Sequence, residues 1–249
     1  MEEYFNIRYE FDKATIHQAI NQQLAKKTSA YICVADGVVL NTVNRDAAYR
    51  EAVGKSLFAI CDSSWVPVYI KWIYGGKKKP QYCGSDIFKD VISMKKYRMA
   101  FLGGQQKTLD SLRKNLCEID ASIADMLFYE LPFLPVEDFN YEEIANKLTD
   151  SGAEIIWVSL GAPKQDFFMN RLQQHLPHGV MLGVGAAFNF FSDVSERRAP
   201  KWMVKAHLEF VFRLTQNPQK QMHRCWNIIK TMPSIFIEEI KKKKKKQNK

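Results

Sequence analysis

The sequence predicts an α/β fold, a Rossmann-like, mainly parallel sheet with helices on both faces, followed by a C-terminal basic helical appendage. Short apolar runs alternate with stretches of helical spacing, which is typical of βαβ units. The 249 residues are 46% hydrophobic, enough to bury a full core. The net charge of +9 is concentrated at the C-terminal end, because fifteen Lys and Arg accompany only four Glu from Ser195 onward. The preceding residues are close to neutral.

The expected strands are short apolar runs, several of which end on a glycine or an acid. They cover residues 30–34, 56–62, 98–104, 154–161 and 179–185. The expected helices are stretches in which apolar residues recur every three or four positions. They cover residues 45–54, 66–75, 86–97, 106–119 and 164–176. Because ligands bind beyond the carboxyl ends of parallel strands, we expect the functional residues in the loops at those ends. These are Asp62, Gly103-Gly104, Gly161 to Gln165, and Gly183 to Asn189.

The stretch SLGAPKQDFFM, residues 159–169, follows an apolar strand and holds five unusual residues in succession. Gly161 allows a ligand to approach the backbone closely. Pro163 suits the first position of a helix, whose free amides and the charge of Lys164 would favour an anion. The alternative is an ordinary strand-to-helix turn with a structural glutamine. On these residues alone the two interpretations are about equally supported.

The residues from 195 onward form a separate segment in our interpretation. Pro200 suits a helix start, and the following stretches mix Trp, Phe and Ile with a Lys or Arg every three or four residues. We expect two or three helices with one apolar and one basic face, then a solvated lysine run. The predicted division is a catalytic body (1–194), a membrane-docking appendage that completes the active site (195–240) and a lysine-rich tail (241–249).

Several classes of protein are disfavoured by what the sequence lacks. It has no apolar run long enough to span a bilayer, and the acidic start is unlike a secretory signal. The five cysteines include no Cys-x-x-Cys pair, which argues against a structural metal. GGQQKT (103–108) fails the P-loop spacing, and GVGAAF (183–188) has a phenylalanine where the dinucleotide fingerprint needs a small residue. No Asp-x-Asp is present for metal chelation.

Taken in order, six segments resemble the WecG/TagA/CpsF family of bacterial glycosyltransferases. They are ICDSSWV, CGSDIF, AFLGG, SLGAPKQDFFM, GVGAAFNFFSDVSERRAPKWM and LEFVFRL. The resemblance covers roughly residues 30–220. It implies an inverting, metal-independent enzyme with a Rossmann-type fold. Such an enzyme transfers N-acetylmannosamine or a related hexose from a UDP-sugar to a polyprenyl-diphosphate-linked saccharide, in the synthesis of a capsule or another surface polysaccharide.

The resemblance also assigns roles to residues of this chain. It implies that Asp62 is the general base or a ligand of the donor sugar, and that Gln165 acts near the donor. A helix cap is the alternative for Asp62 and for Asp86. The remaining donor-site residues are Asp36, Asp86, Gly103, Gly104, Gly161, Ala162, Pro163, Lys164, Gly183, Gly185 and Asn189. The diphosphate of donor or acceptor would bind Arg198, Arg213, Lys220 and Arg224, because a leaving diphosphate needs its charge neutralised.

The chain departs from the family pattern at three places near the presumed donor pocket. Val34-Ala35-Asp36 replaces a Thr-x-Asn, Asp62-Ser63 replaces an Asp-Gly, and Gln81 replaces an arginine. These changes remove hydroxyl and cationic contacts. They bear on the identity of the donor sugar more than on the class of reaction.

The expected partners are the UDP-sugar, the lipid-linked acceptor and an anionic membrane surface, with self-association left open. We expect no metal, no other cofactor and no nucleic acid, and a position at the cytoplasmic face of the plasma membrane. Two other functions compete with this one. The basic tail would also suit a nucleic-acid-binding protein, although interleaved apolar residues favour a membrane interface. Another nucleotide-binding Rossmann protein, such as an oxidoreductase, is weakened by the failed fingerprint.

Overall fold

The protein is built around an eight-stranded sheet, seen in a computed structural model that describes residues 1–192, 199–200, 202–203, 208–216 and 218–247. The strand order is β1-β2-β4-β3-β8-β7-β5-β6, and only β1 and β2 pair antiparallel. The strands are β1 (Glu2–Tyr4), β2 (Ile7–Glu10), β3 (Ser29–Ala35), β4 (Ala59–Cys61), β5 (Met99–Gly103), β6 (Leu127–Tyr129), β7 (Ile155–Ser159) and β8 (Gly179–Gly183). The predicted parallel α/β sheet is therefore confirmed.

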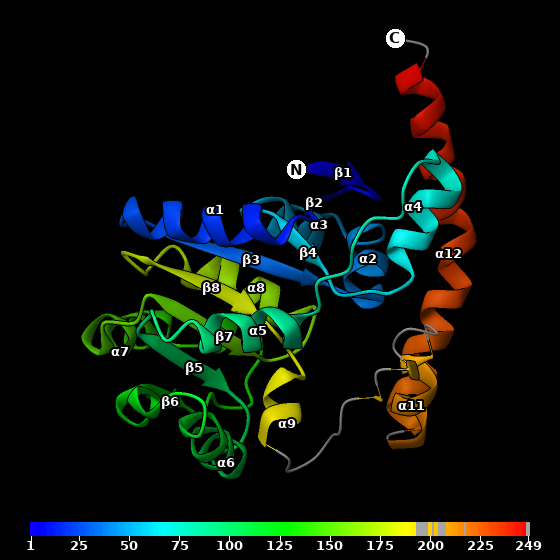
Figure 1. The fold of residues 1–249 in the computed structure, drawn as a ribbon. Helices are drawn as coiled ribbons and strands as arrows, with labels where there is room; N and C mark the ends of the chain where they lie inside the picture. Colours follow the sequence, from blue (N-terminus) through cyan, green and yellow to red (C-terminus); the bar gives the residue numbers. More distant parts are fainter. Residues whose placement is uncertain (193–198, 201, 204–207, 217, 248–249) are drawn as a thin grey trace.

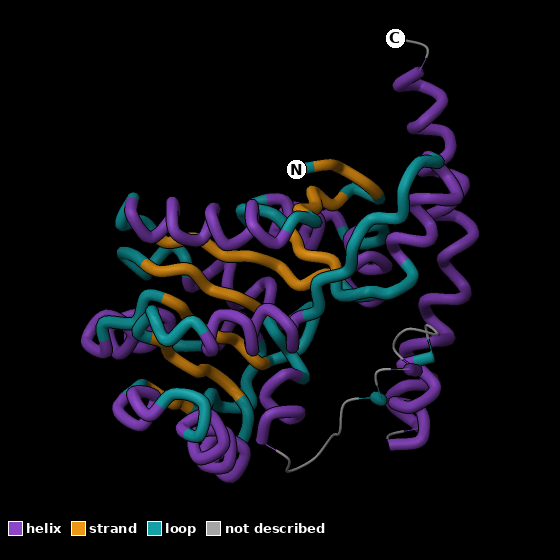
Figure 2. The backbone as a smooth tube through the Cα atoms, in the orientation of Figure 1, coloured by secondary structure: helices purple, strands orange, loops and turns teal. Residues whose placement is uncertain are grey.

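Helices cover both faces of the sheet, as Figure 2 shows. One face packs against α1 (Lys13–Ala25), α5 (Gly84–Ser93), α6 (Gln106–Cys117) and α9 (Ala187–Ser192). The other packs against α2 (Gly37–Val43), α3 (Ala47–Gly54), α7 (Tyr141–Ser151) and α8 (Lys164–Leu172). Two short 3-10 helices, η1 (Ala121–Asp125) and η2 (Val136–Asp138), flank β6. The central strands are buried on both sides, which explains why they read as unbroken apolar runs.

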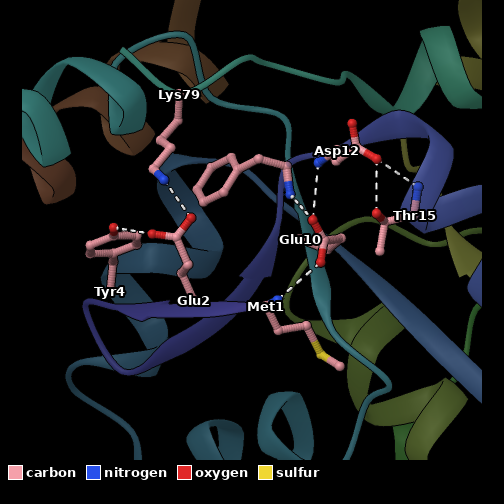
Figure 3. Close-up of polar contacts among 8 residues, drawn as sticks. Met1, Glu2, Tyr4, Glu10, Asp12, Thr15 and Lys79 are labelled. Carbon is pink, nitrogen blue, oxygen red and sulfur yellow. Dashed lines mark hydrogen bonds and ion pairs between the residues drawn. The ribbon is translucent and has the colours of Figure 1, made fainter. Parts of the chain in front are cut away.

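The first ten residues form a hairpin that the sequence analysis did not predict. Phe5 and Asn6, both with positive φ, connect β1 to β2, and β2 extends the sheet by pairing with β4. Polar contacts hold this edge (Figure 3): the terminal amine lies 3.1 Å from Glu10, and Lys79 pairs with Glu2. Asp12 caps α1 by accepting the amide of Thr15. Acidic residues in β1 obscured the strand pattern.

The C-terminal residues form α11 (Glu209–Gln216) and α12 (Pro218–Gln247), and α12 lies beside α2 and α4 (Val66–Tyr74) in Figure 1. Ile235 is buried, and Tyr74 donates a 2.8 Å hydrogen bond to Glu239. The lysine run was expected to be a solvated tail, but α12 continues through it to Gln247, because lysine is a good helix former. Lys243 Nζ donates to the carbonyl of Ile73 at 2.7 Å. Among the described residues, no helix is both long and apolar enough to cross a bilayer.

The backbone at the end of β5 leaves no room for a side chain at Gly103. Its φ is +97°, and a Cβ would lie 2.6 Å from the carbonyl oxygen of Ser159. We expect Gly103→Ala to lower the free energy of unfolding by about 1–3 kcal/mol. Gly54→Ala is the matched control, because a Cβ there meets nothing within 4 Å. Urea denaturation of both variants measures the difference, and equal stabilities would refute this explanation.

Candidate active site

The carboxyl ends of the central strands bring the predicted loops to one edge of the sheet. Gly103 is in register with Ser159, and Val158 with Gly183, so the ends of β5, β7 and β8 are adjacent. Ala35 is in register with Cys61, which places Asp62 beside the end of β3. The loops after β4, β5, β7 and β8 are thus assembled as the sequence predicted.

Gln165 joins two of these loops from within the protein. Its side chain is only 3% exposed. The amide oxygen accepts the backbone N–H of Gly161 at 3.2 Å, and the amide nitrogen donates to the carbonyl of Gly183 at 3.0 Å. Ser159 makes a second link by donating to the carbonyl of Gly185 at 2.7 Å. Gln165 therefore fixes the spacing of the GAPKQ loop and the glycine-rich loop, which is a positioning role.

Asp62 stands directly after β4 with its carboxylate held against α5. Its backbone N–H donates to Ala35 at 3.1 Å, and its carbonyl accepts from the side chain of Gln81 at 2.5 Å. One carboxylate oxygen, Oδ1, accepts the amide of Gly84 at 2.8 Å. Asp62 is not the N-cap of α4 or α5, because those positions belong to Trp65 and Cys83. Its carboxylate nevertheless accepts the first amide of α5, which fixes its orientation. Its catalytic role stays a prediction.

The start of α5 connects Asp62 to the glycine-rich loop. A Cβ at Gly84 would lie 3.1 Å from Val34 and 3.5 Å from the carbonyl of Val184, so α5 meets the ends of β3 and β8 closely. Val184 directly follows Gly183, whose carbonyl accepts a hydrogen bond from the side chain of Gln165. A continuous series of contacts therefore runs from Asp62 to Gln165 across the edge of the sheet.

The other two predicted acids are also tied to helix starts. Asp36 caps α2, since its Oδ1 accepts the amides of Val38 and Val39 at 2.8 and 3.0 Å. Asp86 lies in the first turn of α5 and is half-buried, whereas the cap position belongs to Cys83. The cap alternative for Asp86 is therefore wrong, and its role as a donor ligand stays a prediction.

The GAPKQ loop agrees with the sequence analysis at Gly161 and differs from it at Pro163. Gly161 has a φ of +76° and the Ala162–Pro163 peptide is cis. Helix α8 begins at Lys164, so Pro163 stands at the cap and not at the first helical position; helix ends commonly differ by one residue from a sequence pattern. The Lys164 ammonium lies 5.0 Å from the ring of Phe133 and 5.3 Å from that of Phe139. Phe133 is fully exposed and was missed by the sequence analysis.

The remaining predicted residues divide into two groups. Gly103, Gly104 and Gly185 have positive φ at the edge described above, and Asn189 lies in the short helix α9. Arg198 lies outside the described residues. Arg213 belongs to α11, and Lys220 and Arg224 to α12, but their side chains are outside the described part of the structure. Their binding of a diphosphate stays a prediction.

Asp166, next to Gln165, is a buried acid that the sequence analysis did not single out. It is fully buried, and its Oδ2 accepts the hydroxyl of Tyr49 at 2.5 Å. Its Oδ1 has no hydrogen-bond partner among the described residues. Burial raises the pKa of Asp166 to about 6, although the Tyr49 hydrogen bond opposes the shift. No signal in the local sequence marks Asp166 as buried, since most polar residues within a helix face the solvent.

The fold is that of a Rossmann-type protein, and the candidate ligand site is the edge where the carboxyl ends of its strands meet. Comparison with known families identifies it further. The profile of the glycosyl transferase WecG/TagA/CpsF family matches residues 4–248, and the chain belongs to that family. It is a glycosyltransferase. No cluster of three or more His, Cys, Asp or Glu suited to a metal occurs among the described residues.

Two curated relatives carry the same name, N-acetylglucosaminyldiphosphoundecaprenol N-acetyl-beta-D-mannosaminyltransferase. The protein of Bacillus subtilis (strain 168) is 26% identical over 227 residues, which cover 87% of this chain and 84% of the relative. The protein of Bacillus spizizenii is 25% identical over 224 residues, covering 87% and 82%. Both are similar along most of their length.

Asp166 should make stability depend on pH. Because its folded pKa of about 6 exceeds the ordinary value of 3.8, ionisation costs stability, and the cost grows as pH rises from about 4 to 6. Asp166→Asn keeps an acceptor for Tyr49 but cannot ionise. We expect the variant to gain stability relative to the wild type across this range, by on the order of 3 kcal/mol. Urea unfolding from pH 4 to 7 measures this; parallel pH curves would contradict it.

Proposed function

We propose that this protein transfers N-acetylmannosamine, or a related hexose, from a UDP-sugar to a polyprenyl-diphosphate-linked saccharide. The reaction inverts the anomeric centre and needs no metal. The product enters a surface polysaccharide, a capsule or an exopolysaccharide. The observation that carries the proposal is the edge of the sheet, where the Asp62 carboxylate and the loops fixed by Gln165 converge in a chain of this family.

The relatives support the choice of substrates. Their names describe the transfer of N-acetylmannosamine to an N-acetylglucosaminyl diphosphoundecaprenol, and the similarity covers 87% of this chain. The departures at Val34, Asp36 and Gln81 lie beside Asp62 and α5. We therefore assign the class of donor as a UDP-hexose, with N-acetylmannosamine as its first candidate.

The proposed chemistry is a single displacement at the sugar carbon that bears UDP. An acceptor hydroxyl attacks from the face opposite the UDP, so the new carbon–oxygen bond forms while the bond to the diphosphate breaks. The hydroxyl proton passes to Asp62, and UDP departs with the electron pair. The backbone amide of Gly84 donates a hydrogen bond to Oδ1 of this carboxylate, which limits the rotation of the carboxylate and fixes its orientation.

The negative charge on the departing UDP has to be stabilised by cations. The chain has no Asp-x-Asp sequence for a metal, whereas arginines occur after residue 195. We assign this role to Arg198 and Arg213, with Lys220 and Arg224 as further contacts. The glycines at 161, 183 and 185 would let the donor approach the backbone closely.

The acceptor is attached to a lipid, so the enzyme has to work at a membrane. We place it on the cytoplasmic face of the plasma membrane, as a peripheral protein attached by its C-terminal segment to anionic lipid. The segment combines apolar residues with a lysine run, as interfacial helices do. Whether copies of the chain associate is left open.

Asp62→Asn should abolish most of the transfer activity. Asparagine keeps an oxygen for the amide of Gly84 but cannot accept a proton, so the fold survives while turnover falls by about 10²–10⁴-fold. Asp46→Asn is a matched control, because the carboxylate of Asp46 also accepts a backbone amide at a helix start, that of Tyr49 in α3. Turnover is measured as release of UDP, and stability by thermal unfolding. Normal turnover by Asp62→Asn would remove this residue from catalysis.

Transfer should continue when divalent metals are removed. Because guanidinium groups are proposed to neutralise the leaving diphosphate, excess EDTA should change the rate less than twofold. The assay compares the untreated enzyme with enzyme dialysed against EDTA, then with Mg²⁺ or Mn²⁺ added back. A loss of activity that either metal restores would show that the reaction depends on a cation.

A further inference from the structure

The C-terminal helix α12 presents an exposed apolar stripe. Met222, Trp226, Ile229, Ile237 and Ile240 are 63%, 61%, 64%, 54% and 39% exposed. Their spacings of four, three, eight and three residues place all five on one side of the helix. The opposite side is occupied, since Ile235 and Glu239 are buried against the body. From Met222 to Ile240 the stripe extends about 27 Å along the helix axis.

Helix α4, in the body of the protein, carries a second exposed apolar group. Trp65 and Trp72 are 38% and 66% exposed, and they lie seven residues apart, two helical turns. Tyr69 lies between them, with its ring centroid 6.0 Å from that of Trp65 and 5.9 Å from that of Trp72. The core side of α4 is formed by Val66, Ile70 and Ile73. The two tryptophans are therefore not needed for the core.

The two apolar groups are connected directly. The ring of Tyr69 meets that of Phe236 edge-on, with centroids 5.0 Å apart. Phe236 immediately precedes Ile237 of the stripe. Two hydrogen bonds also hold α4 and α12 together (Figure 1). The Tyr74 hydroxyl donates to Glu239, and the Lys243 ammonium donates to the backbone carbonyl of Ile73. We call the surface formed by Trp65, Trp72 and the five residues of the α12 stripe the two-helix face.

Exposed lysines occur in the same two segments of the chain as the two-helix face. Residues 63–80 contain four lysines and no acid, and α12 carries more cations than acids. The exposed ones are Lys71, Lys77, Lys78, Lys230, Lys241, Lys244 and Lys245. Glu239 is buried in contact with Tyr74, which leaves Glu238 as the exposed acid among the described residues of α12.

This composition indicates one kind of occupant. Tryptophan with an apolar body and a polar N–H suits the boundary between water and lipid, and long lysine side chains keep their charge near headgroups. Protein interfaces are depleted in lysine, which argues against a protein partner. The excess of positive charge matches an anionic leaflet.

We propose that α4 is a membrane-binding element, and that the two-helix face lies on an anionic lipid surface with Trp65 and Trp72 in the interface. This rests on the proposed function in so far as a lipid-linked acceptor requires membrane contact. It extends the membrane contact from the C-terminal segment into the catalytic body. Because α4 begins four residues after Asp62, binding through α4 fixes the distance between the membrane and the proposed general base.

The test is co-sedimentation of the full chain with vesicles of phosphatidylcholine, alone or with 30% phosphatidylglycerol. We expect Trp65→Gln/Trp72→Gln to weaken binding to the anionic vesicles about tenfold or more. Lys71→Gln/Lys77→Gln should weaken it about tenfold at low salt and little at high salt. The matched control is Lys107→Gln/Lys114→Gln on α6, where both lysines are exposed and α6 packs against α9 and β6.

Two further readouts separate the outcomes. Turnover of a water-soluble acceptor analogue should be unchanged in the α4 variants. If the wild-type protein is inactive with every UDP-sugar, the proposed function is refuted, but the proposed lipid contact is not. The role of α4 would be overturned if Trp65→Gln/Trp72→Gln binds vesicles as strongly as the wild type does, whereas Trp226→Gln/Ile229→Gln no longer binds them. Analytical ultracentrifugation without lipid tests the other occupant. If the wild type is a dimer and Trp65→Gln/Trp72→Gln is a monomer, the two-helix face binds a second copy of the chain and not lipid.

Discussion

The geometry of the site depends on the two hydrogen bonds of one buried amide, that of Gln165. A buried amide that leaves its donor or acceptor unpaired is costly, so the loops at Gly161 and Gly183 are held where both bonds can form. The close fit at Gly183 adds to this constraint, because a Cβ there would lie 3.0 Å from the Gln165 amide nitrogen. The family motif thus has a structural role, in which Gln165 holds the two loops at a fixed spacing.

The candidate site illustrates how one residue can serve the fold and the chemistry together. Asp36 and Asp62 both accept backbone amides at helix starts, an interaction that a purely structural interpretation would predict. The same bonds align each carboxylate at the edge where substrates of parallel sheets bind. A carboxylate can therefore accept a backbone amide and still serve in catalysis. The two roles are distinguished by whether the function needs the negative charge of the carboxylate, since its position suits both.

Much of the body could be predicted from the sequence, because buried parallel strands give unbroken apolar runs and their loops have to meet at one edge. The β1–β2 hairpin escaped prediction since β1 is three residues long and begins with two glutamates. Asp166 escaped because nothing local reveals that a polar residue within a helix faces the core. The helical lysine run escaped because a row of like charges suggests repulsion, whereas contacts of Lys242 and Lys243 with the body stabilise it.

The attachment of Lys242 to Asn6 has a consequence for biosynthesis. It joins the β1–β2 hairpin to α12 across a separation of 236 residues, so this contact forms only after α12 has been synthesised. A chain folds from its N-terminus as it is synthesised, and the body therefore forms with the seat of α12 open to water. Once α12 has been made, it can cover the surface of α2 and α4. A nascent chain stalled before residue 218 would present an adhesive surface to chaperones.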